Sequence, residues 1–376
     1  MKKLYTTILI LFVIVISIPF LQMHTEIINL KPLKGAITKT KKPTFHFNNW
    51  LNIKYQDSVE NYVKDHIGCY SLFIRIRNQI SYSIFNEAKA RDVVIGINNY
   101  LFEKNYIDAY NGDDFIGEDS IKARVKRIVS IDNYLKSKNK TLIICFAAGK
   151  GSYYPDYFPD KDKKKATDRT NYKQYVKALS KTNVNLLDLN RWFLQMKDTS
   201  KFILFPKYSI HWSYYGEFLV TDSLVRYVEH LRNEDLPNIE LKSYEIWDKP
   251  KPTDQDIVEG MNLLFRYKEK PFCYPKYIWQ NSVGKTKPKT IVVSDSFYWQ
   301  IFNNQTNTKA FSLGGFWYYN YKIYPDSYKK PTRVYHKNIV EEIENNDIFI
   351  IMATEANLKS LGWGFLDNDI FKELDN

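Results

Sequence analysis

The chain has 376 residues, of which 44% are hydrophobic and 16% aromatic, so it has ample apolar material for a core, and intrinsic disorder is excluded for most of the chain. Its three cysteines, Cys69, Cys145 and Cys273, are too few and too scattered for a disulfide framework or a thiolate zinc site. The formal net charge of +12 would suit a nucleic-acid-binding protein, and the rest of the sequence must decide what that charge meets.

An apolar segment without charges opens the chain. Lys2 and Lys3 precede the stretch from Leu4 to Met23, which at about 1.5 Å per residue is long enough for the roughly 30 Å hydrocarbon core of a bilayer. A core helix would normally have a polar stripe along one side, and this stretch has none. No small-x-small cleavage site follows Phe20. We therefore expect residues 1–23 to be an uncleaved signal anchor that forms a transmembrane helix.

Lysines on both sides of this segment compete in setting its orientation. Lys2 and Lys3 stand before it, and five lysines follow it between positions 31 and 42. Because long downstream domains often translocate regardless of such charges, we place residues 24–376 outside the cytoplasm. The segment 24–48 is then a spacer between the membrane and the folded domain.

A helical region is expected next, over residues 49–90. Apolar residues recur at helical spacing in two segments, one around Val59 and Val63 and one from Leu72 to Ile84, with Gly68 as a break between them. Two short strands, 93–96 and 98–102, follow and are joined by a tight turn.

From residue 91 to 376 the pattern alternates between helices and strands. Continuous apolar runs, which are typical of strands buried on both faces, alternate with amphipathic helices. The expected strands are 141–147, 184–189, 290–293 and 348–353, and the expected helices are 119–135, 172–179, 217–231 and 357–361. This alternation predicts an α/β fold of three layers, α/β/α, with a mainly parallel central sheet. Residues 232–288, rich in Lys, Pro and Tyr, interrupt it and look like an insertion.

Functional groups in such a sheet collect beyond the carboxyl ends of the strands. The strand at 290–293 runs into Ser294-Asp295-Ser296, followed by a helix, where a serine hydroxyl would lie near the positive end of the helix dipole. The simpler alternative is that Ser294 or Ser296 only caps that helix.

Histidine and lysine mark two further places. Of the six histidines, only His211 stands among aromatic and hydroxyl residues just before a helix, where it could serve as the general base for Ser296. Lys150, in Ala148-Gly149-Lys150-Gly151-Ser152, follows a buried strand, but the glycine spacing of a phosphate-binding P-loop is missing. No dinucleotide fingerprint and no metal-binding motif occurs, so we expect no cofactor and no metal.

The order of these features resembles the SGNH-hydrolase-like family of alginate and cell-surface polysaccharide O-acetylation proteins. The family's motifs are matched, in order along the chain, by Gly96 with Leu101-Phe102, Lys150 with Tyr154 to Pro159, Ser209-Ile210-His211-Trp212, and Ser294-Asp295-Ser296-Phe297. The resemblance covers residues 1 to about 360 and is weakest over 232–288.

Carried over to this chain, the resemblance makes Ser296 the nucleophile and His211 the general base, and it implies substrate contacts from Trp212, Lys150, Tyr298 and Trp317. The family's acid, two residues before the histidine, falls on Ser209, which has a hydroxyl but no charge. Either another carboxylate orients the histidine, or a Ser–His dyad works slowly, or the domain binds without catalysing. Asp295 is beside the nucleophile in sequence, which alone does not make it the triad acid.

The resemblance implies an extracytoplasmic O-acetyltransferase, or acetylesterase, that acts on a polysaccharide through an acetyl-serine intermediate. It also implies a bacterial inner-membrane location and a multispanning membrane acyltransferase as acetyl donor. The alternative is a catalytically impaired domain that binds polysaccharide or scaffolds an export complex, for which the aromatic run Phe316-Trp317-Tyr318-Tyr319 would offer flat apolar faces. In that compartment the excess positive charge is expected to meet acidic polysaccharide or anionic lipid headgroups rather than nucleic acid.

Overall fold

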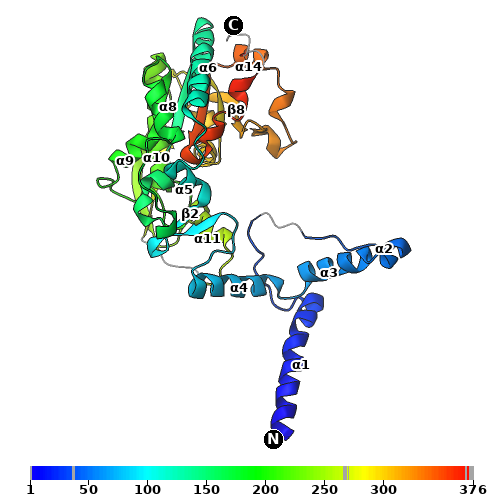
Figure 1. Ribbon diagram of the computed structural model, residues 1–376. Helices are drawn as coiled ribbons and strands as arrows, with labels where there is room; N and C mark the ends of the chain where they lie inside the picture. Colours follow the sequence, from blue (N-terminus) through cyan, green and yellow to red (C-terminus); the bar gives the residue numbers. More distant parts are fainter. Residues whose placement is uncertain (1, 36–38, 266–268, 270, 369–370, 372–376) are drawn as a thin grey trace. The chain divides into compact units, whose positions relative to one another are not determined.

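A computed structural model describes residues 2–35, 39–265, 269, 271–368 and 371 (Figure 1). Parts of the predicted spacer (36–38), of the predicted insertion (266–268 and 270) and of the C-terminus lie outside the described residues. The chain divides into two compact units. Unit 1 is Met1–Arg91 with Ile257–Lys268, and unit 2 is Asp92–Asp256 with Glu269–Asn376.

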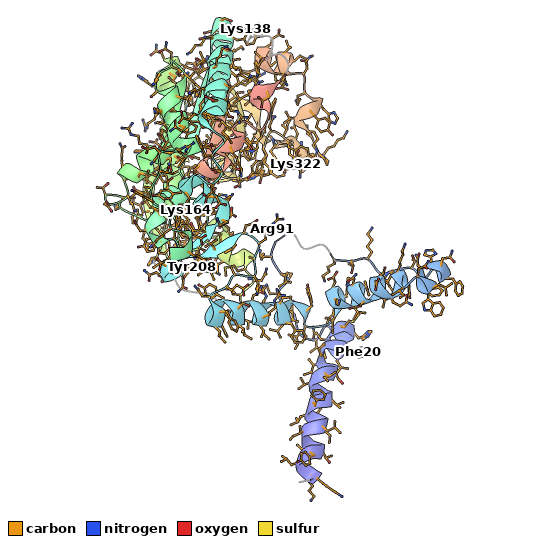
Figure 2. All side chains as sticks on the ribbon, viewed as in Figure 1. Phe20, Arg91, Lys138, Lys164, Tyr208 and Lys322 are labelled. Carbon is orange, nitrogen blue, oxygen red and sulfur yellow. The ribbon has the colours of Figure 1, made fainter. Side chains whose placement is uncertain are left out.

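Unit 1 is helical. Its helices are α1 (Lys2–Thr25), α2 (Phe47–Leu51), α3 (Lys54–His66) and α4 (Tyr70–Phe85). Gly68 lies in the turn between α3 and α4, so the predicted helical lead-in with a break at this glycine is confirmed. Helix α1 has a mean hydropathy of 2.6, buries none of its residues against the described part of the protein, and is long and apolar enough to cross a membrane. Its side chains, Phe20 among them, project from the helix in Figure 2.

Unit 2 is built on a six-stranded sheet with the order β4-β3-β10-β7-β8-β9. All neighbours in this sheet are parallel except β8 and β9, which are antiparallel. The strands are β3 (Thr141–Ala147), β4 (Asn185–Asp188), β7 (Lys289–Ser294), β8 (Ser312–Tyr318), β9 (Lys322–Tyr324) and β10 (Ile348–Thr354). The predicted mainly parallel sheet is therefore present.

Helices cover both faces of this sheet, because the central strands are apolar on both sides. On one face, residues such as Ile144, Ile351 and Val293 form a core with α6 (Glu118–Ser137), α8 (Asn171–Leu179) and α14 (Ile339–Asn345). On the other face lie α10 (Tyr214–Arg232) and α12 (Tyr298–Asn303), where the ring of Tyr298 meets Phe316 of β8 at 5.1 Å. The predicted three-layer α/β/α arrangement follows from these contacts.

Shorter elements connect these layers. They include β1 (Val93–Ile95) and β2 (Leu101–Glu103), which pair antiparallel as predicted, and the helices α5 (Lys104–Asn111), α7 (Lys150–Tyr153), α9 (Leu189–Gln195), α11 (Asp256–Gly260) and α13 (Thr306–Lys309). The helix predicted over 357–361 is a 3₁₀ segment, η7 (Glu355–Ser360).

Within the predicted insertion 232–288, the structure has a separate antiparallel pair, β5 (Ile239–Trp247) and β6 (Phe272–Trp279). The segment between these two strands begins on unit 2 and passes through the part of unit 1 formed by Ile257–Lys268. Its first stretch, residues 248–256, is called the strap below, because it leads to a residue of the candidate site.

Candidate active site

The loop that carries Ser296 is fixed to the carboxyl end of the sheet. Strand β7 ends at Ser294, and the buried Asp295 follows. One Asp295 carboxylate oxygen accepts from the backbone N–H of Phe297 at 3.1 Å. The other accepts from Thr354 N, Thr354 Oγ1 and Asn357 Nδ2, each at 2.9 Å. Asp295 therefore ties the loop to β10, and the hydroxyl of Ser296 meets a different partner.

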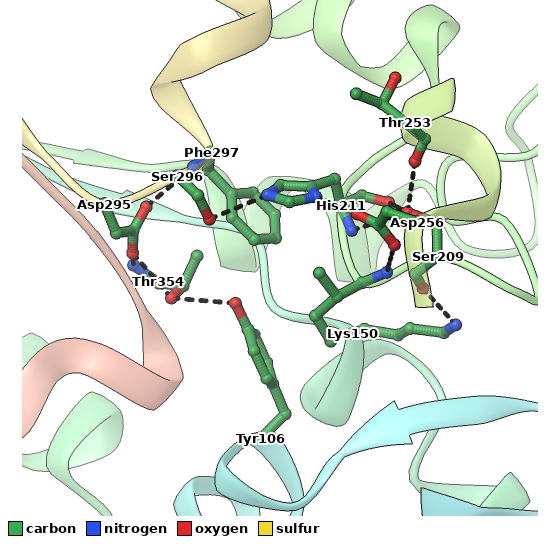
Figure 3. Close-up of polar contacts among 11 residues, drawn as sticks. Tyr106, Lys150, Ser209, His211, Thr253, Asp256, Asp295, Ser296, Phe297 and Thr354 are labelled. Atoms are coloured by element: carbon green, nitrogen blue, oxygen red, sulfur yellow. Dashed lines mark hydrogen bonds and ion pairs between the residues drawn. The ribbon is translucent and has the colours of Figure 1, made fainter. Parts of the chain in front are cut away.

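That partner is His211, which precedes α10. The Ser296 Oγ and His211 Nε2 atoms are 2.9 Å apart (Figure 3). Ser213 caps α10 by accepting from the backbone N–H of Gly216 at 3.0 Å, which fixes the chain just after the histidine. The imidazole ring also contacts the Phe297 ring, with 4.7 Å between centroids. The structure thus brings together the two residues that the sequence singled out as nucleophile and base.

A carboxylate reaches the other nitrogen of this imidazole. Asp256, the last residue of the strap, is hydrogen-bonded through Oδ2 to His211 Nδ1, and its Oδ1 accepts from the backbone N–H of Ile210 at 3.0 Å. A carboxylate on Nδ1 holds the proton there and leaves Nε2 free to accept the proton of Ser296. Asp256 was not predicted, because it lies 45 residues after His211 in a region that the sequence marked only as an insertion.

Ser209, at the position where the resemblance placed the acid, binds backbone groups instead of the imidazole. Its Oγ donates to the backbone carbonyl of Thr253 at 2.6 Å and accepts from the backbone N–H of His211 at 3.0 Å. The buried hydroxyl therefore joins the strap to the loop that carries the histidine. Ser209 therefore does not act as the acid: its side chain binds backbone groups. Of the alternatives that the sequence left open, the structure has the one in which another carboxylate, Asp256, orients His211.

The surroundings of His211 favour its charged form. Burial by itself lowers the pKa of the imidazole, but the charge and hydrogen bond of Asp256, together with the charges of Asp295 and Glu103, outweigh burial and raise the pKa above its ordinary value. An imidazolium that forms when Ser296 loses its proton is therefore stabilised where it arises.

Lys150 is buried rather than open to a ligand. Its Nζ donates to the backbone carbonyls of Lys207 at 2.8 Å and Ser209 at 2.5 Å, so it holds the segment that leads to His211. Burial lowers the pKa of this ammonium group to about 7, and the nearby carboxylate of Glu269 opposes that shift. The expected substrate contact through Lys150 is not what the structure shows for this side chain.

The three aromatic residues expected to contact substrate are also buried. Trp212, Tyr298 and Trp317 are each 0% exposed. The Tyr298 hydroxyl donates to Asn307 at 2.6 Å, and Trp317 belongs to the core on one face of the sheet. Within the aromatic run that the binding alternative relied on, Phe316 and Trp317 are buried, because β8 is covered on both faces.

Tyr319 is a further neighbour of the nucleophile that was not predicted. Burial raises the pKa of its phenol, as do the nearby charges, while a hydrogen bond with Ser296 acts in the opposite direction. The phenol therefore stays protonated at neutral pH and is available as a hydrogen-bond donor beside the reacting oxygen. The only signal in the sequence was that Tyr319 directly follows a strand, and this is too common a position to single out a functional residue.

Among the residues that the structure describes, no group of three or more His, Cys, Asp or Glu side chains is arranged to hold a metal ion. The arrangement Asp256–His211–Ser296 by itself is suited to nucleophilic catalysis, because a base lies on the serine hydroxyl and a carboxylate orients that base.

Comparisons with known proteins agree with this fold. Residues 93–263 match the family described as ALGX, SGNH hydrolase-like domain, acetyltransferase AlgX. That range contains His211 and Asp256, and Ser296 lies beyond it. A comparison with curated protein sequences found no match.

Several solved structures are similar to the chain. The O-acetyltransferase domain of Pseudomonas putida AlgJ is 14% identical with a TM-score of 0.48, over 76% of this chain and 98% of that one. Pseudomonas aeruginosa AlgX is 12% identical with a TM-score of 0.45, over 73% and 66%. Bacillus cereus PatB1 is 12% identical with a TM-score of 0.41, over 66% and 93%. The predicted resemblance is confirmed over residues 93–263, which match the model of an SGNH hydrolase-like domain of acetyltransferase AlgX.

Proposed function

We propose that the chain is an extracytoplasmic O-acetyltransferase that modifies an exported or cell-surface polysaccharide through an acetyl-Ser296 intermediate. The observation that carries the proposal is the continuous chain of contacts from Asp256 through His211 to Ser296. The family match supports the reaction class.

The reaction proceeds in two halves that use the same three residues. In the first, His211 Nε2 takes the proton of Ser296 as Oγ attacks the acetyl carbonyl, and the imidazolium then gives this proton to the leaving group of the donor. In the second, His211 takes a proton from a sugar hydroxyl, which attacks the acetyl-serine ester, and the imidazolium returns this proton to Ser296 Oγ as the ester bond to serine breaks. The products are the acetylated sugar and free Ser296. If water takes the place of the sugar, the same residues perform acetylester hydrolysis.

The alternative of a binding domain without catalysis loses its two supports. It depended on the missing carboxylate at position 209 and on an exposed aromatic run. Asp256 occupies the histidine's Nδ1, and Phe316 and Trp317 are buried.

The location belongs to the proposal as well. Residues 1–23 act as a signal anchor in a bacterial inner membrane, 24–48 as a spacer, 49–90 as a helical lead-in, and 91–376 as the SGNH domain outside the cytoplasm. Helix α1 supports this by its length and composition. A multispanning membrane acyltransferase is the proposed source of acetyl groups.

The test uses the full chain in detergent with p-nitrophenyl acetate as acetyl donor. We expect release of p-nitrophenol and, by mass spectrometry of peptides after acid quenching, an acetyl group on Ser296. The Ser296→Ala variant should lose both. Ser294→Ala is the matched control, since this serine lies two residues away and its Oγ has no hydrogen-bond partner among the described residues. Full activity of the Ser296→Ala variant would refute the assignment of Ser296 as the nucleophile. Glycan binding by the unaltered chain without any turnover would favour the alternative of a non-catalytic binding domain.

A further inference from the structure

Helix α4 is amphipathic in the opposite sense to a helix of a water-soluble domain. Its buried residues are Asn78, Gln79, Ser81 and Tyr82. Its exposed face carries an apolar row, here called the α4 stripe, made of Phe73, Ile76, Ile80 and Ile84, with exposures of 47%, 37%, 45% and 71%. Spacings of three and four residues place these side chains along one side of the helix.

Hydrogen bonds within unit 1 fix the roll of α4 that exposes the stripe. Asn78 Nδ2 donates to the carbonyl of Met261 at 2.8 Å, and Gln79 Oε1 accepts from the N–H of Phe265 at 3.1 Å. Arg75 Nη1 donates to the carbonyl of Leu263 at 3.3 Å. Rotating α4 to bury the stripe would break these bonds, so the exposure of the stripe is built into the unit.

The stripe begins next to the apolar helix α1. Gly68, two residues before α4, lies so close to the end of α1 that a Cβ there would come within 2.1 Å of Pro19 O and 2.6 Å of Met23 N. The chain therefore enters α4 directly from a backbone contact with the last turns of the helix that is suited to cross a membrane.

We propose that the α4 stripe lies in the interfacial region of the bilayer that α1 spans, with its apolar side chains at the boundary between headgroups and acyl chains. The inference rests on the proposed membrane anchoring of α1. The exposed Arg77, on α4 itself, and Lys54, at the start of α3, supply cations for anionic headgroups. Trp50 on α2, 45% exposed, is of the residue type enriched at this depth of a membrane.

The experiment places an environment-sensitive fluorophore at single engineered cysteines of the full chain, reconstituted in vesicles of phosphatidylcholine and phosphatidylglycerol. The positions are Ile80→Cys and Ile84→Cys on the stripe, Ile14→Cys on α1, and Lys126→Cys on the exposed surface of unit 2. The three native cysteines are buried, and labelling of the unaltered chain gives the background. Quenching is measured with lipids spin-labelled near the headgroup and with aqueous iodide.

At both stripe positions the spin-labelled lipid should quench the fluorescence of the attached probe. Iodide should quench it at least several-fold less than it quenches the probe at Lys126→Cys. Iodide quenching equal to that of Lys126→Cys would overturn the proposal. Protection from both quenchers would also overturn it, since a second copy of the chain would then cover the stripe. Ile14→Cys reports the anchor separately, and acetylation of Ser296 in the same vesicles reports the proposed catalysis, so the three failures are distinguishable.

Discussion

At the scale of single residues, the carboxylate on His211 comes from a part of the chain that a motif search does not reach. Asp256 lies 45 residues after the histidine and 40 before Ser296. Ser209, where the resemblance placed the acid, instead joins the strap to the loop of His211 through its hydroxyl. The negative charge beside the imidazole comes from the strap.

Replacing Asp256 by asparagine should test whether this carboxylate acts as the triad acid. An amide cannot stabilise the imidazolium and can hold the wrong tautomer, and in an unrelated serine hydrolase such a change lowers kcat about 10⁴-fold. We expect a loss of about 10³- to 10⁴-fold in the acetylation rate of Ser296. Asp248→Asn, an exposed residue of the same strap, is the control and should keep full activity. A loss below about tenfold in Asp256→Asn would contradict the assignment.

The pH dependence of acetylation should report the raised pKa of His211. The imidazole must be neutral to accept the proton of Ser296, so activity rises with pH through this pKa, and the midpoint should lie above the ordinary histidine value of about 6.5. Asp256→Asn removes the main charge that raises the pKa, so any residual activity should have its midpoint at lower pH. Stopped-flow release of p-nitrophenol between about pH 5 and 9 measures the midpoints of the unaltered protein and of Asp256→Asn. Equal midpoints in the two proteins would contradict the proposal that Asp256 raises the pKa of His211.

Sequence reasoning found Ser296 and His211 because each stands beside a recognisable strand end or helix start. It could not find Asp256, because the choice among the carboxylates of residues 232–288 depends on how the strap folds back onto Ser209 and Ile210. It also misjudged Lys150, since nothing in the local sequence says that an ammonium group will bind two backbone carbonyls.

At the scale of elements, the strap is held at both of its sides. The Tyr274 hydroxyl, from β6, donates to Asp254 Oδ2 at 2.6 Å and accepts from the N–H of Lys251 at 2.8 Å. Ser209 binds Thr253 from the other side. The antiparallel pair β5–β6 thereby supports the segment that delivers Asp256, which gives this insertion a role in the site.

Ser209→Ala should loosen the strap and slow the reaction. It leaves the carbonyl of Thr253 and the N–H of His211 without their partner in a buried place, at a cost of about 1–3 kcal/mol. We expect kcat to fall about 10- to 100-fold with little change in KM. The midpoint of the pH profile should move to lower pH, because Asp256 is less well held. An unchanged pH profile together with a lower melting temperature would indicate a purely structural role for Ser209.

Glu217, in the interior of α10, should make stability depend on pH. Burial raises the pKa of this carboxyl to about 7 from 4.5, so the folded state favours the protonated form. The protonated Glu217 side chain contributes fully to the free energy of unfolding below the unfolded pKa. This contribution is lost as pH rises through about 7, which lowers the free energy of unfolding on the order of 3 kcal/mol. Glu217→Gln should flatten the fall in melting temperature between about pH 4.5 and 8. The exposed Glu344→Gln should leave that fall unchanged, and identical slopes in the two variants would contradict this prediction.

The central strands were predictable because each is a continuous apolar run, as in Thr141–Ala147 and Ile348–Thr354. Such a run is typical of a strand that is covered on both faces. The pair β5–β6 was not, because its strands mix exposed charges with aromatic residues and lie outside the main sheet. The 3₁₀ segment 355–360 has the composition of a helix, and in the structure it follows directly on the end of β10.

At the scale of the whole molecule, the chain joins a helical unit that contains α1 to a unit of α/β type that contains the candidate site. The net charge of the chain is +12, and individual lysines such as the exposed Lys164 (labelled in Figure 2) pair with neighbouring carboxylates, here Asp113. A net positive charge of this size favours acidic partners.

Under the proposed function, the orientation of α1 in the membrane decides whether unit 2 can meet an exported polysaccharide, and labelling of intact cells tests this orientation. Lys126→Cys, on the exposed surface of α6, should react with a membrane-impermeant maleimide from outside, after the outer layers of the envelope are made permeable. Lys3→Cys, at the start of α1, should react only after the cytoplasmic membrane is opened, because Lys2 and Lys3 remain inside under the proposed orientation. The lysines after α1 oppose this arrangement, so the reverse pattern is the physical alternative. Labelling of Lys3→Cys but not Lys126→Cys from outside would place the triad in the cytoplasm and would remove the extracytoplasmic part of the proposed function.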